Sequence, residues 1–483
     1  MKPFAIPTFQ PRLKVLNKEQ ALAIHSAALE ILDKTGFRME HRGALEMLLD
    51  AGCRQLSDSR VRLPSYLVEQ ALSSAPKLIA IYNQNGSKTM PLFGSNPFYG
   101  TGSDATFTLD LESGKRRRAV LSDVANFARA VDSLENISFN MSMANPEDVP
   151  VIEDIYVYVF AEMVKNTDKP LVIIADRGQD LAKIYEMACL IAGGEEQFQQ
   201  KPFILNYSEA ISPLHFPAKV VDRLLFCAQK RIPVCLPSGS NAGGGAPVTL
   251  AGAMALGIAE NLVGLVVHQL AGRGAPFVFG PNVSSLDMKS TIVSYGCPEW
   301  SLTQSALADM RDELYGLPIW AYAGATDSKV MDAQAGAAAM FSITTAMLSR
   351  ANLIHDVGFL EHGNTSSLEM VVMTNELVAM SRFFTDGIPV DDETLALDAI
   401  DRVARSESGS IFLTDDHTFE HFMKAQFLPV MIDRARHDSW LAEGGLDMYQ
   451  RCNIAAKKIL STHQVRPKPD QVLKGIDEIL QRR

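Results

Sequence analysis

Cysteine is rare in this sequence, and the cysteines present form no close pair along the chain. Six occur in 483 residues, none of them in a C-x-x-C pair: Cys53, Cys189, Cys227, Cys235, Cys297 and Cys452. Scattered cysteines are typical of a reducing compartment, and they argue against a disulfide framework or a zinc finger. The first residues, MKPFAIPTFQPRLKVLN, also lack the continuous apolar segment of a secretory signal. We therefore expect a cytoplasmic protein.

Positive charge is in deficit as well. The chain has 45 Lys and Arg against 56 Asp and Glu, a formal net charge of −11. Nucleic-acid binding depends on clustered basic side chains, so we expect no nucleic-acid partner. The basic run GKRRRAV, from Gly114 to Val120, predicts a solvated hairpin or loop. A docking patch for an acidic partner is the alternative.

Uninterrupted apolar segments of membrane-spanning length are missing. From Ile232 to Ala259 no residue is charged, but prolines and glycines break this stretch, and Glu260, Asn261 and His268 follow it. Such a pattern indicates a buried strand, a loop and a core helix, so we expect no membrane span.

Several familiar catalytic patterns are absent. The glycine-rich segment CLPSGSNAGGGAPVTL, residues 235–250, has no lysine after its glycines and does not match G-x-G-x-x-G, which argues against a nucleotide site. The chain also lacks a G-x-S-x-G elbow and an H-E-x-x-H helix. With these patterns absent, the sequence shows no obvious nucleophile or metal site.

One metal-binding pattern does occur. HTFEH, from His417 to His421, matches H-x-x-E-H, in which two histidines four residues apart on a helix grip a metal. The alternative is an ordinary helix for which the preceding DDHT supplies the N-cap. A corrin-carrying protein that uses a histidine ligand needs D-x-H-x-x-G, but here Glu420 replaces the glycine after Asp415 and His417. We therefore expect that this chain does not carry its own corrin.

Short apolar strands alternate with longer amphipathic helices through the middle of the chain. The predicted strands are 98–101, 138–142, 171–175, 203–207, 233–237, 277–280, 318–322 and 352–356. Eight consecutive strand–helix units predict a (β/α)8 TIM barrel of the α/β class, with a doubly wound open sheet as the alternative. We place the barrel at residues 96–388, after a mainly helical segment at 1–95 and before a helical extension at 389–483.

The predicted site lies where strands end and helices begin, because that is where such barrels place their chemistry. Free backbone N–H groups of the glycine-rich loop suit a small carboxylate, and its small residues would also allow a large planar group to approach. Aromatic side chains lie near the same edge, and aromatic rings attract a cation that has no N–H to donate. Core packing is the alternative for each of these rings.

Three segments resemble a known family: FYGTGSDATFTLDLESGKRRRAVLSDVANFARAVDSLENI, YAGATDSKVMDAQAG and HTFEHFMKAQFLPVMIDR. They resemble the trimethylamine methyltransferase family, over nearly the whole chain. The resemblance implies a TIM-type barrel that moves a methyl group from an amine to the Co(I) of a separate corrinoid protein. The archaeal trimethylamine enzymes carry pyrrolysine, which is absent here. The chain is therefore similar to the non-pyrrolysine branch, whose members demethylate quaternary amines such as glycine betaine, proline betaine, carnitine or γ-butyrobetaine.

The resemblance implies glycine betaine as substrate and dimethylglycine as product. It implies no tightly bound cofactor, since the cognate corrinoid protein supplies the cobalamin, and we further expect a homo-oligomer. An aromatic cage for the ammonium group is predicted from Tyr99, Tyr207, Trp320, Tyr322 and Phe359. The carboxylate is assigned to His355 and to the loop residues Ser238, Gly239, Ser240, Asn241, Gly243 and Gly244. Two alternatives remain: a zinc hydrolase that uses HTFEH, and a betaine-binding protein without catalysis.

Overall fold

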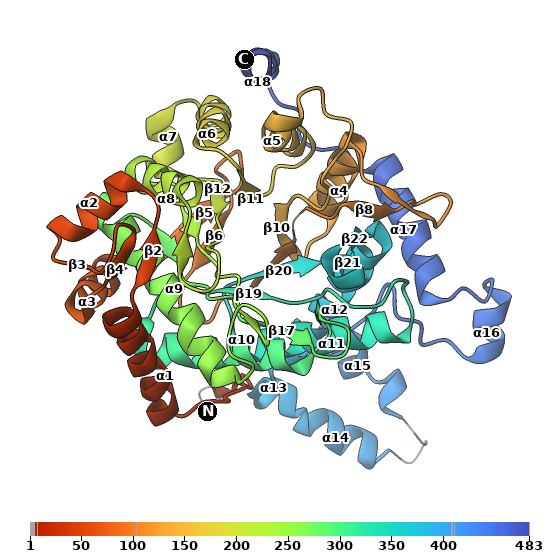
Figure 1. Ribbon diagram of the computed structural model, residues 1–483. Coiled ribbons are helices and arrows are strands. Elements are labelled where there is room, and N and C mark those ends of the chain that lie inside the picture. Colours follow the sequence, from red (N-terminus) through yellow and green to blue (C-terminus); the bar gives the residue numbers. More distant parts are fainter. Residues whose placement is uncertain (1–4, 7, 103, 407–408, 410, 483) are drawn as a thin grey trace.

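Eight parallel strands form a closed barrel in the computed structural model, which describes residues 5–6, 8–102, 104–406, 409 and 411–482 (Figure 1). The strand order is β16-β14-β12-β11-β10-β7-β20-β19, and a parallel bridge between Phe279 and Ile319 joins the two ends of this order. The strands are β7 (Phe98–Thr101), β10 (Ile137–Met141), β11 (Leu171–Ile174), β12 (Ile204–Tyr207), β14 (Val234–Cys235), β16 (Phe277–Val278), β19 (Trp320–Tyr322) and β20 (Leu353–Val357). The predicted barrel is confirmed, and its closure excludes the open sheet.

A helix follows each strand and covers the outside of the barrel. These helices are α4 (Leu121–Ser133), α5 (Ile155–Asn166), α6 (Gly178–Ala192), α8 (Ala218–Lys230), α9 (Leu250–Ala271), α10 (Pro298–Met310), α11 (Ala333–Ser349) and α12 (Leu368–Asp386). Helix α9 is long and apolar enough to cross a membrane, but 83% of its most apolar window is buried inside the fold. It is therefore a core helix, as the interrupted pattern of its sequence indicates.

Inward-facing side chains from the strands fill the barrel, and an N-terminal hairpin closes one end of it. The interior cluster includes Phe139, Leu205, Trp320 and Leu353 together with side chains of β5 (Ile79–Tyr82) and β6 (Thr89–Leu92). The backbone of this hairpin bonds to Pro202, which lies just before β12. The hairpin thus blocks the amino ends of the strands and leaves only the carboxyl ends open.

The remaining N-terminal elements pack on the side of the barrel near α9. Helices α1 (Lys18–Glu30) and α3 (Ser65–Ser74) contact α9 directly, and α2 (Arg42–Asp50) lies beside them (Figure 1). A small sheet combines β2 (Phe37–Met39), β3 (Arg54–Gln55) and β4 (Arg60–Arg62) with β13 (His215–Phe216), which follows β12. The segment therefore supports the loop that leaves strand β12.

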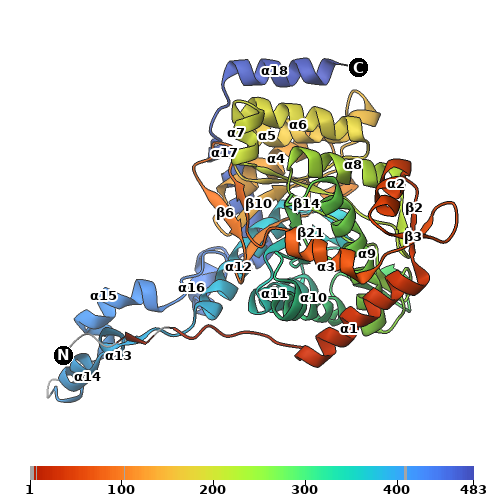
Figure 2. The same cartoon turned by 90° about the vertical axis from the view of Figure 1, so that its left-hand side faces the viewer.

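The C-terminal region forms an arm and then returns to the barrel (Figure 2). Strand β23 (Val390–Asp391) pairs with β1 (Ala5–Ile6) and departs from the all-helical pattern that we expected here. Helices α13 (Asp392–Leu395), α14 (Leu397–Ala404) and α15 (Asp416–Ala425) project away from the barrel. The chain returns through α16 (His437–Ala442), α17 (Met448–Thr462), which packs on α12 and α4, and α18 (Asp470–Gln481), which packs on α6.

Candidate active site

A cavity of about 630 Å³ lies at the carboxyl ends of the strands. Residues that directly follow β11, β12, β14 and β20 line it. A hairpin of β17 (Ser284–Asp287) and β18 (Ile292–Val293), inserted between β16 and α10, covers part of its rim. In this fold the carboxyl-end cavity is the position at which ligands bind, so we take it as the candidate active site.

Aromatic rings form one wall and the floor of this cavity. On the wall, Tyr295 and Trp300 have ring centroids 4.7 Å apart, and Trp300 stacks on Tyr322 at 4.1 Å with an interplanar angle of 14°. On the floor, Trp320 stacks against His355 at 4.4 Å, and Tyr207 lies 5.7 Å from Trp320. The negative faces of such rings attract an organic cation, most strongly where water is excluded.

Carboxylates accompany the rings in the cavity lining. Desolvation within the cavity raises the pKa of Glu209 to about 7, although its side chain stays open to the solvent, and the pKa of half-buried Asp104 to about 6. The neighbouring His355 opposes the first shift, and the hydroxyl of Tyr156, which donates to Asp104 Oδ2 over 3.0 Å, opposes the second. A carboxylate that is poorly solvated in this way gains stability when a cation binds beside it. The cavity is therefore suited to bind a cation.

A β-bulge turns two consecutive side chains into the same cavity. Neighbouring residues of a strand normally point to opposite faces, yet both His355 and Asp356 line the cavity. The pairing of β20 with β7 shifts register between Ile354 and Val357, and Asp356 has a positive φ of 79°. Bulges of this kind redirect side chains beside active sites. Strain persists there because the surrounding fold holds it, and Asp104 and His362 also have positive φ, 61° and 58°.

His355 is held by stacking rather than by hydrogen bonds. Its ring is nearly buried, with a relative exposure of 5%. Nδ1 lies 2.8 Å from Oδ1 of Asp356 without hydrogen-bond alignment, and Nε2 has no hydrogen-bond partner among the described residues. Since buried polar atoms are nearly always satisfied, Nε2 is available to a ligand, whereas Nδ1 faces the carboxylate of Asp356.

Six of the predicted site residues line the cavity, and the other six do not. The lining residues are Tyr207, Phe359, His355, Ser238, Gly239 and Asn241. Trp320 lies below the floor and Tyr322 behind Trp300, so each supports a lining ring without reaching the cavity. They pair with Leu353 and His355 of β20 and occupy deeper positions than we expected.

Tyr99 and the rest of the glycine loop point elsewhere. Tyr99 faces the helix layer, where its hydroxyl donates to the carbonyl oxygen of Ile343 over 2.7 Å. The hydroxyl of Ser240 donates to Glu260 at 2.9 Å and so fixes the loop against α9. Gly243 and Gly244 abut the β17–β18 hairpin, and Gly243 has a positive φ of 90° that favours glycine. These glycines therefore serve the turn, because the cover hairpin lies between them and any ligand.

Several lining residues were absent from the sequence prediction: Asp104, Glu209, Arg223, Tyr295, Trp300 and Asp356. Asp104, Glu209 and Asp356 lie in loops that the predicted strand ends already marked. Arg223 interrupts the apolar face of α8, since Val220 and Cys227 at helical spacing are buried with it. That interruption was a usable signal. Tyr295 and Trp300 follow an inserted hairpin and had no periodic signal at all.

The HTFEH pattern lies on α15, in the projecting arm (Figure 2). Asp415 caps this helix through the N–H of His417, as DDHT predicted. The rings of His417 and His421 are 4.4 Å apart, and Nε2 of His421 lies 3.7 Å from Oε1 of Glu393. Among the described residues, no group of three or more His, Cys, Asp or Glu side chains is arranged to hold a metal ion.

The basic run GKRRRAV forms the hairpin that we predicted. It contains β9 (Arg116–Arg118), which pairs with β8 (Phe107–Leu109).

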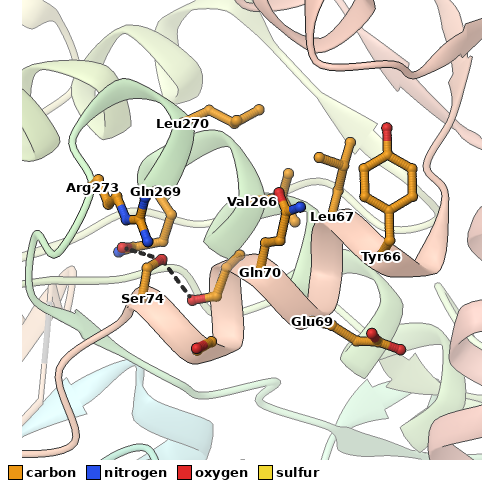
Figure 3. Close-up of a pocket in the computed structure, with 11 residues that line it drawn as sticks. Tyr66, Leu67, Glu69, Gln70, Ser74, Val266, Gln269, Leu270 and Arg273 are labelled. Carbon is orange, nitrogen blue, oxygen red and sulfur yellow. Dashed lines mark hydrogen bonds between the residues drawn. The ribbon is translucent and has the colours of Figure 1, made fainter.

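A second hollow, of about 720 Å³, lies between α3 and the last turns of α9 (Figure 3). Helix α9 starts at the carboxyl end of β14 and runs back, so its last turns lie toward the amino ends of the strands. Ser74 and Gln269 in this hollow bond to each other over 3.0 Å, and Glu69 and Arg273 stand at its edge. The buried polar groups at its base, Ser74 and Gln269, satisfy each other, so we assign it no ligand.

The fold and the site together define a class of protein. It is a (β/α)8 barrel whose carboxyl-end cavity combines carboxylates with aromatic rings, a composition suited to a small organic cation. The sequence places the chain more narrowly. It belongs to the trimethylamine methyltransferase family, for which the family's sequence model matches residues 4–483. The chain is therefore a methyltransferase, and the resemblance seen in its sequence is confirmed.

Two relatives illustrate the range of named activities. The chain is 30% identical over 465 residues to a trimethylamine methyltransferase of Desulfitobacterium hafniense, covering 96% of this chain and 92% of that one. It is 29% identical over 456 residues to a glycine betaine methyltransferase of the same species, covering 94% and 93%. Among solved structures, the monomethylamine methyltransferase of Methanosarcina barkeri shares the fold, with a TM-score of 0.52, 10% identity and coverage of 94% and 89%.

Proposed function

We propose that this protein transfers a methyl group from a quaternary amine to the Co(I) of a corrinoid carried by a separate protein, and releases the tertiary amine. Glycine betaine is the substrate that we place first, with dimethylglycine as the product. The cavity carries the proposal, because it combines aromatic rings with the partly desolvated carboxylates Glu209 and Asp104. The relative named glycine betaine methyltransferase supports the choice of substrate.

The chemistry places few demands on the protein. The C–N bond breaks with both electrons remaining on nitrogen, so a quaternary ammonium leaves as a neutral amine and needs no proton. The corrinoid, when its carrier protein docks, supplies the electron pair for the new bond to carbon. The residues of this chain need only align the methyl group toward the mouth and exclude water. A cavity of this size is in the range that holds drug-sized ligands, so a small amine leaves room at the mouth.

The lining residues divide into two roles. The rings of Tyr207, Tyr295, Trp300 and Phe359 surround the ammonium group, with Trp320 and Tyr322 holding those rings from behind. The remaining predicted lining residues serve the polar end of the substrate: His355, Ser238, Gly239 and Asn241. Tyr99, Ser240, Gly243 and Gly244 have structural roles. Six free cysteines support a cytoplasmic site for the reaction.

Methylation of free cob(I)alamin tests the proposal. We expect methylcobalamin to form when the purified protein is mixed with cob(I)alamin and one quaternary amine from a panel of betaines, choline and tetramethylammonium. Its absorbance spectrum provides the readout, and Glu209→Gln serves as the impaired control. Binding of a betaine without any methylation would contradict the proposal and would favour the binding protein without catalysis. Activity that requires added zinc would instead favour the hydrolase.

We also propose that the protein is a homo-oligomer in which the arm packs on a second copy. Large apolar side chains on and beside the arm are exposed: Ile388 80%, Leu397 67%, Leu413 79%, Phe419 80% and Val430 76%. Exposed apolar area of this extent is unusual on a monomer, and the projecting arm has no barrel surface of its own chain beside it (Figure 2).

The double variant Leu413→Glu/Phe419→Glu is accordingly expected to reduce the mass measured by light scattering to that of one chain. The unfolding temperature of the barrel should fall little, because neither side chain contacts the barrel core. The matched control, Leu78→Glu, changes an exposed leucine (55%) near the closed end of the barrel and should leave the mass unchanged. A wild-type protein that is already monomeric would overturn the proposal.

A further inference from the structure

Arg223 places a buried positive charge in the cavity without a carboxylate beside it. Its side chain extends from α8 and is only 6% exposed. Nε donates to Oγ of Ser208 over 3.1 Å, and Nη1 donates to the backbone carbonyl oxygen of Asp176. The carboxylate of Asp176 is bound instead by Nζ of Lys219 at 2.6 Å. Among the described residues, no carboxylate oxygen lies within ion-pair distance of Arg223.

Three other arginines that are partly or fully buried have such partners, whereas the half-buried Arg129 and Arg451 bind only neutral oxygen atoms and lie outside the cavity. Arg117 is paired with Asp110 and Asp123, and Arg177 is paired with Asp154 and Asp180. Arg311, which is even more buried at 2% exposure, has Asp312 at 2.8 Å. A buried charge without a counterion is strongly unfavourable, and the penalty falls when an anion arrives. Arg223 is therefore positioned for an anion that comes from outside the chain.

Arg223 and the aromatic rings come from different elements of the cavity lining. Asp176 and Asp180 act on Arg223 without forming an ion pair with it, and it also faces Tyr156 on α5, whose hydroxyl donates to Asp104. Asp356 and Glu209 instead act on Tyr207 and Tyr295, which belong to the aromatic wall and floor. The cavity thus offers one guanidinium, on α8, together with a set of rings. A zwitterion can use both, whereas a simple ammonium ion can use only the rings.

We propose that Arg223 binds the carboxylate of the substrate and thereby selects zwitterionic quaternary amines over choline-like and simple methylated amines. This inference rests on the proposed function, since it assigns the substrate class of the same site. A guanidinium offers paired N–H donors that fit the two oxygens of a carboxylate. The donors at Ser238 and Asn241, and Nε2 of His355, then orient the substrate around this ion pair.

Calorimetric binding to the full-length protein tests the inference without any methyl acceptor. The probes are glycine betaine and choline, and γ-butyrobetaine and its methyl ester, because each pair differs only at the carboxylate end. We expect the wild type to bind the carboxylate member roughly 10- to 100-fold more tightly, the range for a charge-assisted hydrogen-bonded pair. Arg223→Gln should bring this ratio near one, and Arg223→Lys should retain part of it.

Arg311→Gln is the matched control, because it removes a buried guanidinium outside the cavity. It should lower the unfolding temperature and leave the ratio unchanged. If Arg223→Gln does not fold, the test depends on the binding ratio of the wild type and on that of Arg223→Lys. A wild type that binds both members equally, or a folded Arg223→Gln that keeps the full ratio, would overturn the inference.

Turnover separates this inference from the proposed function. If the wild type methylates cob(I)alamin from choline but from neither betaine, the proposed function stands and the role of Arg223 is wrong. If the betaines bind with an Arg223-dependent preference but no amine transfers a methyl group, the role of Arg223 stands and the proposed function is wrong.

Discussion

Replacing Glu209 by glutamine is expected to lower kcat/KM for the quaternary amine by roughly 10-fold, the scale of one lost charge contact that remains open to solvent. Glu209 lies in the loop after β12, adjacent to Gly239 and near His355. Its carboxylate is the closest candidate for pairing with the ammonium group over Tyr207. The amide keeps the shape of the side chain but removes its charge, so steady-state kinetics should show an effect chiefly on binding.

The pH dependence gives this prediction a second readout. Because burial raises the pKa of Glu209 to about 7, the carboxyl group is neutral below that pH and ionised above it. The kcat/KM of the wild type should therefore rise with pH through about 7 and then level off, since this parameter reports groups of the free enzyme. In Glu209→Gln that rise should disappear, leaving a smaller one near 6 from Asp104.

Glu376→Gln provides the control for removal of a buried carboxylate. Glu376 is 5% exposed and accepts N–H groups of Val430 and Met431, at the base of the arm. This variant should unfold at a lower temperature and keep the pH profile of the wild type. An unchanged kcat/KM and an unchanged profile in Glu209→Gln would show that the charge of Glu209 takes no part in binding.

Tyr207→Leu is expected to lower kcat/KM by roughly 10- to 30-fold, since a desolvated cation–π contact contributes up to about 2 kcal/mol. Tyr207 ends β12 and stands beside Trp320 and His355 at the cavity floor. Tyr207→Phe keeps the ring and removes the hydroxyl that hydrogen-bonds to Glu209, so its kcat/KM should stay within about threefold of the wild type when measured well above pH 7, where Glu209 is ionised. The comparison separates the ring from the hydroxyl in one kinetic series.

Tyr185→Leu controls for the general loss of an aromatic side chain. Tyr185 is 7% exposed and packs against Phe198 and Phe226 on the outer side of the barrel. Its replacement should reduce the unfolding temperature through the cavity that it leaves, without changing KM. Equal kinetic losses in Tyr207→Leu and Tyr207→Phe would assign the effect to the hydroxyl and contradict the cation–π role.

The sequence was sufficient for the barrel because its signals are local. Each strand is a short apolar run followed by an amphipathic helix, and eight such units leave few ways to close a sheet. The same reasoning located the mouth, so residues directly at strand ends, such as Tyr207, His355 and Ser238, were placed on the cavity. The glycine-rich segment was also located correctly between β14 and α9.

The sequence could not show to which face of a strand each side chain points. Barrel strands are apolar on both faces, so the alternation that separates inside from outside in other sheets is missing. Tyr99 therefore looked like a mouth residue, although it faces α11. The bulge that brings Asp356 into the cavity beside His355 depends on strand pairing between β20 and β7, which lie far apart in the sequence.

By itself, then, the sequence determined the fold class, the family and the edge of the barrel that holds the site, because periodicity and family motifs are properties of neighbouring residues. Only the tertiary structure decided which groups meet there. It brought Tyr295 and Trp300 to the cavity from the segment that follows an inserted hairpin, desolvated Glu209 enough to raise its pKa, and left Arg223 without a counterion. Burial and electrostatic pairing arise from contacts between distant segments, and no local pattern encodes them.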